Sequence, residues 1–123
     1  MSIAFWCLFV AGLAPVAVVL IAKADPNLDV ANPRDVHLTQ TGLRKRAYGA
    51  HLNSLEAFPL FAVAVLSATA RGANQLWLDL AACSWVAIRI AYTTAYLTDL
   101  AKIRPGLWAL SVFISAALFL LPA

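Results

Sequence analysis

Residues 3–22 read IAFWCLFVAGLAPVAVVLIA and contain no charged side chain. A helix of about 20 apolar residues is long enough to cross the hydrocarbon core of a membrane. A cleaved signal peptide is the alternative, because Ala22-Lys23-Ala24 is similar to a signal-peptidase site. Signal peptides, however, begin with basic residues and contain a shorter apolar stretch of about 7–15 residues. The segment therefore predicts a retained first transmembrane helix.

The composition of the whole chain also favours a membrane protein. Hydrophobic residues make up 63% of the 123 residues and charged residues only 12%, whereas soluble domains contain about 45–50% apolar and about 25% charged residues. A chain this short has too little interior to hide so much apolar surface from water. A soluble globular protein is therefore excluded, and so is a disordered chain, which would need a polar composition.

Three further apolar runs follow the first one. They cover approximately residues 46–70, 76–98 and 107–123. Polar segments with helix-terminating residues separate the runs, and the longest of them extends from Asp25 to about Thr41. The sequence thus predicts an all-α integral membrane protein. We expect a single domain over residues 1–123, folded as a bundle of four transmembrane helices.

The positive charges indicate the side of the membrane on which each connection lies. The first and third connections contain Lys23, Arg34, Arg44, Lys45, Arg46, Lys102 and Arg104. The second connection contains only Arg71. Because cytoplasmic loops are enriched in Lys and Arg, we expect both termini to lie outside the cytoplasm. The charges do not gather in one patch with interleaved aromatic residues, so nucleic-acid binding is not expected.

The two cysteines, Cys7 and Cys83, both lie inside apolar runs. Their separation does not match any metal-ligand spacing. We therefore expect two free, buried thiols and no metal site.

Polar residues inside the second and third runs form two stripes. Ionisable groups within a membrane are costly, by about 2.5–3.5 kcal/mol on insertion scales, so each needs a partner or a function. At 100° per residue, the stripe of the second run spans roughly 80° of the helix. It consists of Arg46, Gly49, Asn53 and Glu56. The third run carries Arg89, Tyr92, Thr93 and Tyr96 on a comparable arc. We expect the two stripes to face each other or a shared cavity.

The depth of each residue predicts which side chains of the two stripes meet. At 1.5 Å per residue, Glu56 and Arg89 both lie roughly 13–15 Å from the cytoplasmic surface, and Asn53 and Tyr92 both lie near 10 Å. We therefore predict two layers, Glu56 with Arg89 and Asn53 with Tyr92. Polar groups that only hold membrane helices together are the alternative, at about 0.6–2 kcal/mol each. His51 lies off the stripe and is interpreted as a packing or interfacial residue.

The two stripes belong to longer motifs. Residues 46–61 read RAYGAHLNSLEAFPLF and contain an Asn, a Glu and a Pro at intervals of three, namely Asn53, Glu56 and Pro59. The third run contains an Arg-x-x-Tyr-x-x-x-Tyr pattern made of Arg89, Tyr92 and Tyr96. Both motifs resemble those of the MAPEG family, the membrane-associated proteins in eicosanoid and glutathione metabolism, and the chain resembles a bacterial-type member of it.

The resemblance implies a homotrimer of four-helix protomers that binds glutathione between neighbouring subunits near the cytosolic side. The residues that match the family's glutathione contacts are Asn53, Glu56, Arg89, Tyr92 and Tyr96. In the family, an Arg at the start of the fourth helix faces the glutathione sulfur, and Arg104 is the nearest counterpart. Arginines suit the two carboxylates of glutathione, and a carboxylate suits its ammonium group. A cation beside the sulfur would stabilise the thiolate.

The expected function is that of a glutathione-dependent transferase or peroxidase. Glutathione would be the co-substrate, and a lipophilic electrophile or a lipid hydroperoxide would be the second substrate. No metal is required. The resemblance also implies an integral protein of the bacterial inner membrane.

Two positions differ from the glutathione-conjugating members of the family. Gly49 stands where they carry an arginine, and Ala57 where they carry a tyrosine. Arg46, one turn away on the same face, could replace the missing charge. If it does not, the alternative is a non-catalytic lipid-binding or scaffold protein of the same fold. A small four-span transporter is a third possibility, but such transporters carry their essential Glu in the first helix, whereas the single Glu of this chain is Glu56.

Overall fold

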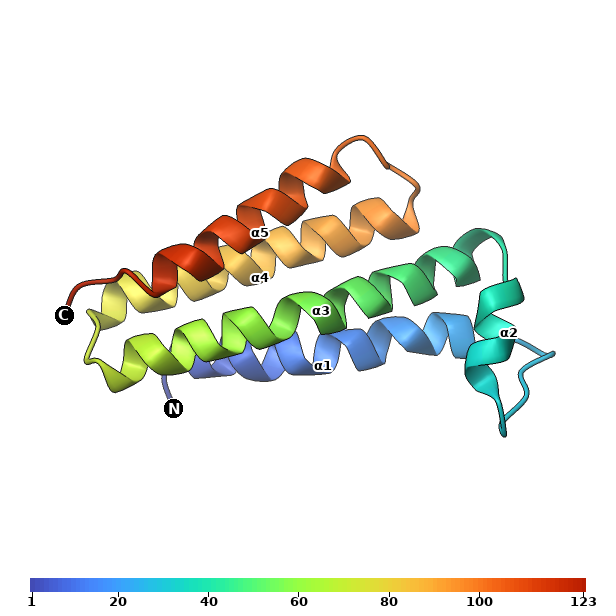
Figure 1. The fold of residues 1–123 in the computed structure, drawn as a ribbon, viewed down its shortest axis with the longest axis horizontal. Coiled ribbons are helices and arrows are strands. Elements are labelled where there is room, and N and C mark those ends of the chain that lie inside the picture. Colours follow the sequence, from blue (N-terminus) through green and yellow to red (C-terminus); the bar gives the residue numbers. More distant parts are fainter.

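The long helices of the chain lie side by side and run back and forth along one axis (Figure 1). The computed structural model describes all 123 residues. The helices are α1 (Ile3–Lys23), α2 (Pro33–Thr39), α3 (Gly42–Ala70), α4 (Gln75–Leu97) and α5 (Arg104–Leu118). Both termini lie at one end of the bundle, and α2 and the α4–α5 connection lie at the other (Figure 1). The four long helices therefore alternate in direction.

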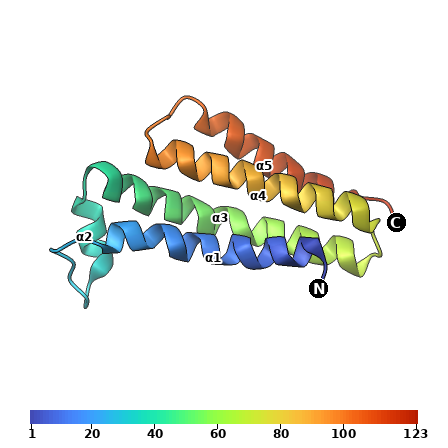
Figure 2. The same cartoon turned by 180° about the vertical axis from the view of Figure 1, so that it is seen from behind.

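The central element of the bundle is α3, which contacts every other helix. Figure 2 shows the opposite side, with α1 along one flank of α3 and α5 lying on α4. The all-helical class predicted from the sequence is confirmed. Three helices, α1, α3 and α4, are long and apolar enough to cross a membrane, and α5 is a shorter apolar helix of 15 residues.

The helix ends differ from the apolar runs at α3 and α5. α3 begins at Gly42, four residues before Arg46, because the polar residues before the apolar run also adopt helical backbone. α5 begins at Arg104, with a proline in its first turn, where the missing N–H leaves no hydrogen bond unmade. Its last turn ends where the Arg71 guanidinium donates to the carbonyl oxygens of Leu118 and Leu121, at 3.2 Å each. A cation at this position also complements the negative end of the helix dipole.

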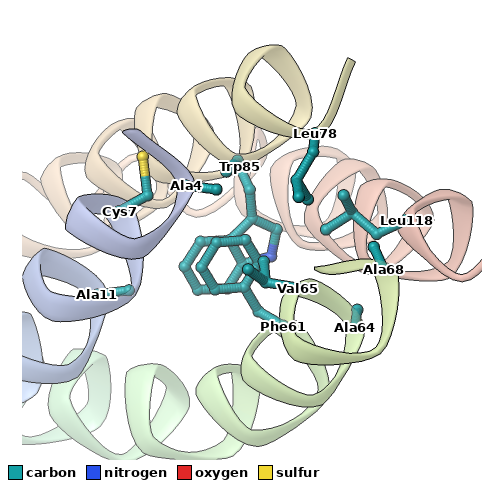
Figure 3. Close-up of a cluster of buried hydrophobic side chains, with 11 residues drawn as sticks. Ala4, Cys7, Ala11, Phe61, Ala64, Val65, Ala68, Leu78, Trp85 and Leu118 are labelled. Carbon is teal, nitrogen blue, oxygen red and sulfur yellow. The ribbon is translucent and has the colours of Figure 1, made fainter. Parts of the chain in front are cut away.

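The half of the bundle that holds the termini contains the apolar core (Figure 3). Phe61 of α3 and Trp85 of α4 stack with ring centroids 3.8 Å apart and an angle of 2° between the rings. Buried small residues surround this pair and let the backbones approach closely, as is usual between membrane helices. They include Ala4, Ala11, Ala64, Ala68 and Ala82. Ser111 and Ser115 of α5 are also buried.

The first connection is not a plain loop, because part of it folds into α2 and docks on the bundle. The side-chain amide of Gln40 donates to the carbonyl oxygen of Ala22 at 2.9 Å and to the Asp25 carboxylate at 2.8 Å. Its oxygen lies 2.9 Å from Nδ1 of His37, whose ring stacks on Tyr48. The hydrogen bond from Gln40 holds the pKa of the Asp25 carboxyl below its ordinary value. The pattern of apolar runs carried no signal for this helix.

Replacing Phe61 with alanine should lower the free energy of unfolding by about 3 kcal/mol, because the stack with Trp85 loses one ring and leaves a void. Thermal unfolding in detergent measures this effect. The matched control is Phe113→Ala on α5, where the side chain is 69% exposed and the change should have little effect. Equal losses in the two variants would show that the stack does not stabilise the core.

Candidate functional site

The relative position of α3 and α4 is set at the end of the bundle opposite the termini. Nε of Arg46, near the start of α3, donates to the carbonyl oxygen of Leu97 at 3.0 Å. Leu97 is the last residue of α4, so this bond satisfies one of the carbonyl groups that a helix end leaves free. It also places Arg46 level with the final turn of α4. This bond sets which residues of the two antiparallel helices lie opposite each other farther along the bundle.

Seven residues beyond Arg46 along α3, Asn53 meets Arg89 of α4. Nη2 of Arg89 donates to Oδ1 of Asn53, and the Arg89 side chain is only 7% exposed. The predicted layers, Glu56 with Arg89 and Asn53 with Tyr92, are therefore wrong by almost one helical turn. The expected pairing placed Arg46 level with Thr98, whereas Arg46 bonds to Leu97. This shift of one residue in the register of α3 and α4 brings Asn53 opposite Arg89.

Aromatic rings connect Arg89 with the end of the bundle. The guanidinium carbon of Arg89 lies 4.4 Å from the centre of the Tyr92 ring. Tyr92 and Tyr96 pack edge to face, with centroids 6.0 Å apart. The guanidinium carbon of Arg104, in the first turn of α5, lies 4.0 Å from the centre of the Tyr96 ring. Cation–π contacts of this kind stabilise a pair by about 0.5–2 kcal/mol. The result is a continuous stack from Arg89 to Arg104.

Gly49 makes room for this stack. A Cβ atom at position 49 would lie 2.7 Å from Cζ of Tyr96, so any larger residue would displace the ring. The space beside Gly49 is thus filled by Tyr96. Arg104 lies against this ring, and Arg46 lines the same cavity from the preceding turn of α3.

A cavity of about 300 Å³ opens beside the stack at the end of the bundle. It is lined by Gly42, Lys45, Arg46, Tyr96, Asp99 and Arg104. Lys45 and Asp99 were not among the residues singled out from the sequence. Asp99 has a φ of 63°, a backbone conformation that Asp adopts more readily than most residues, and this placement follows from the turn after α4. Three cations and one carboxylate therefore surround one concave surface.

Two buried donors at the site have no partner. They are Nη1 of Arg89 and Nε of Arg104. Buried polar groups are normally hydrogen-bonded, because an unmade bond to a charged group costs more than about 1–3 kcal/mol. Such donors are available to an anionic or carbonyl-bearing ligand that reaches them.

Glu56 stands apart from the other predicted site residues. Its carboxylate is exposed and lines a separate cavity of about 200 Å³ between α3, α4 and α5. Apolar and small side chains form most of this cavity, including Ala57, Leu60 and Trp108. The structure thus joins six of the seven predicted residues in one network and places Glu56 in the adjoining cleft.

His51 has a structural partner. Its Nδ1 donates to the carbonyl oxygen of Pro15 in α1 at 2.7 Å. This contact ties α3 to α1 on the side away from α4, which agrees with the packing role expected for His51. The structure also contains no group of three or more His, Cys, Asp or Glu side chains that could hold a metal ion.

The fold and the cationic, aromatic site define a class of protein, a helical membrane protein with a polar pocket at one end of its bundle. The model of the MAPEG family matches residues 3–123. The chain therefore belongs to the MAPEG family, whose members are membrane proteins. No curated protein and no solved structure matches the chain.

Replacing Asn53 with alanine should lower the free energy of unfolding by about 2 kcal/mol, because Arg89 then loses its only side-chain hydrogen bond while remaining buried. Chemical or thermal unfolding without any ligand measures this loss. Combining Asn53→Ala with Arg89→Met, which removes both polar partners, should recover most of the stability. A double variant less stable than Asn53→Ala would contradict this account of the pair.

Proposed function

We propose that this protein is a glutathione-dependent transferase or peroxidase that acts on a lipophilic electrophile or a lipid hydroperoxide at the cytosolic side of the membrane. Membership of the MAPEG family suggests glutathione-related chemistry of this general type. The observation that carries the proposal is the cavity in which Arg46, Lys45 and Arg104 converge beside Tyr96. Its charges match a small molecule with two carboxylates, one ammonium group and a thiol.

Each group of glutathione has a chemically suitable partner near this cavity. Arg46 and Lys45 provide positive charge for carboxylates, and Asp99 provides a carboxylate for the ammonium group. Arg104 is fixed over Tyr96 and keeps a buried Nε free for an acceptor. Arg89, Asn53 and Tyr92 continue the polar surface inward, where they would hold the peptide groups.

Arg104 is the residue that we assign to the reaction itself. A guanidinium beside the sulfur favours the thiolate, which is the nucleophilic form. In a transferase, the thiolate forms a carbon–sulfur bond with the electrophile, and the electron pair of the broken bond leaves with the leaving group or the opened ring. In a peroxidase, the thiolate attacks the terminal oxygen of the hydroperoxide and releases an alcohol. A second glutathione then forms the disulfide and water.

The lipophilic substrate would approach through the cleft that contains Glu56. This cleft is largely apolar and adjoins Trp85, which ends the polar stack on the side of the core. The exposed Glu56 carboxylate is available to a ligand held between two subunits, in keeping with the homotrimer that the family resemblance implies.

The distribution of basic residues supports a cytosolic position for the cavity and an orientation with both termini outside. The inner membrane of a bacterium is the proposed location.

A non-catalytic lipid-binding or scaffold protein of the same fold is the second candidate. Gly49 favours it, because the ring of Tyr96 occupies the space of the arginine found in conjugating members. Ala57 favours it as well, since it adds no polar group to the cleft. Glutathione binding separates the two candidates.

Calorimetry of the purified protein in detergent should show saturable glutathione binding that Asp99→Asn weakens about tenfold, a loss of about 1.4 kcal/mol, because the ammonium group then loses its carboxylate partner. The control is Asp35→Asn, which removes an exposed carboxylate in α2 and should leave binding unchanged. Absence of binding at millimolar glutathione, with the protein folded, would refute the proposed enzyme and favour the lipid-binding candidate.

Replacing Arg104 with alanine should leave the oligomer intact and reduce turnover about 100-fold or more, as for other groups that stabilise a developing or full negative charge. Conjugation of 1-chloro-2,4-dinitrobenzene and reduction of cumene hydroperoxide provide two assays. Lys102→Ala, which removes an exposed cation from the same connection, is the matched control. Unchanged turnover in Arg104→Ala would remove Arg104 from the mechanism.

A further inference from the structure

Two thiols meet between α1 and α4, beside the apolar core. Sγ of Cys7 and Sγ of Cys83 lie 3.8 Å apart, and the two cysteines are not bonded to each other. Figure 3 shows the Cys7 sulfur pointing from α1 toward α4. One turn before the thiols, the backbone N–H of Ala4 donates to Asp79 at 2.9 Å. This bond holds the two helices together at the level of the thiols.

The two cysteines differ in exposure. Cys7 is 8% exposed and belongs to the apolar core, whereas Cys83 is exposed on the outer surface of the bundle. The expectation that both thiols are buried is therefore wrong for Cys83, because α4 turns this residue outward beside α1. An accessible thiol with a second thiol directly behind it is the usual arrangement of a redox-active pair.

We infer that Cys7 and Cys83 are a redox-active pair that forms an intramolecular disulfide when an organic hydroperoxide reaches them from the bilayer. The Cys83 sulfur attacks the terminal oxygen of the hydroperoxide, the O–O bond breaks, and the alcohol leaves with the thiol proton. The Cys7 sulfur then attacks the resulting sulfenic acid and releases water. In total, two thiols and one hydroperoxide give one disulfide, one alcohol and one water.

The required movement is small. A disulfide has a sulfur–sulfur distance of about 2.05 Å, so the two atoms must approach by less than about 2 Å. The parallel course of α1 and α4, held by the bond from Ala4 to Asp79, keeps the thiols opposite each other.

The position of the pair selects a lipophilic oxidant. Cys83 lies eight residues into α4, roughly 12 Å along the helix, and is exposed on the outer surface of a helix long and apolar enough to cross a membrane, where we expect acyl chains. Oxidised glutathione and other charged oxidants are poorly soluble at this depth. One turn further along the two helices, α1 and α4 form a mainly apolar cavity of about 210 Å³, which Val10 and Val86 line at the end near the thiols and Arg89 lines farther along. A fatty acyl chain held in this cavity would bring a hydroperoxide within about one helical turn of Cys83.

The cross-link has a structural consequence for the same helices. It joins α1 to α4 across most of the chain and limits the freedom of the unfolded state, which stabilises the folded protein. It also sets the distance between α1 and α4 at one end of the cavity. The thiols themselves are not part of the glutathione site, although the cavity next to them reaches Arg89. Disulfide formation and glutathione binding are measured separately, so the two proposals can fail separately.

The test uses the full-length, reduced protein in liposomes, treated with cumene hydroperoxide. After denaturation, a maleimide reagent should label two thiols before treatment and none afterwards, and the intact mass should fall by about 2 Da, the mass of two hydrogens. The melting temperature should rise and return to its original value after reduction. Persistence of both thiols, or disulfide-linked dimers in place of the internal bond, would overturn the inference.

The single variants test the order of the two steps. Cys7→Ser should leave a Cys83 sulfenic acid that dimedone traps, whereas Cys83→Ser should leave Cys7 unmodified because Cys7 is buried. Equal reactivity of the two variants would refute the assigned roles. Hydrogen peroxide at the same concentration should react at least about tenfold more slowly than cumene hydroperoxide, and equal rates would refute the lipophilic oxidant. Glutathione binding should be unchanged in both variants.

Discussion

The structure depends on a buried guanidinium that has no acidic partner. A charged side chain inside a membrane costs about 2.5–3.5 kcal/mol on insertion scales, and Arg89 is accommodated by the amide oxygen of Asn53 and by the face of Tyr92. These contacts come from two different helices. A change in the relative position of α3 and α4 would break the hydrogen bond between Arg89 and Asn53. The burial of Arg89 therefore also determines how α3 and α4 pack against each other.

Beyond Arg89, each side chain of the site packs against the next one. Tyr92 supports Arg89, Tyr96 packs against Tyr92, and Arg104 lies over Tyr96. The last ring reaches its place because position 49 lacks a side chain. Gly49 is therefore a structural requirement of this stack.

Much of the fold could be predicted from the sequence, because a lipid environment leaves long apolar helices as the main solution for such a chain. The polar stripes also predicted most residues of the network, because an ionisable group in a membrane is costly unless it has a partner or a function. The pairing within the stripes could not be predicted, because it depends on a register shift of one residue between α3 and α4, which the bond from Arg46 to Leu97 sets and the sequence pattern does not show. The docking of α2 by Gln40 and the outward position of Cys83 depend on long-range contacts, which periodicity does not contain.

The length of α5 has a consequence for the surrounding lipid. Its 15 residues span roughly 22 Å, whereas the hydrocarbon core of a bilayer is about 30 Å thick. A bilayer adapts to a short span by thinning locally and by drawing headgroups inward, at a cost of a fraction of a kcal/mol per Å. We therefore expect the bilayer to be thinner next to α5 than next to the three longer helices. Headgroups and water would there come closer to Arg104 than they would beside a helix that spans the full hydrocarbon core.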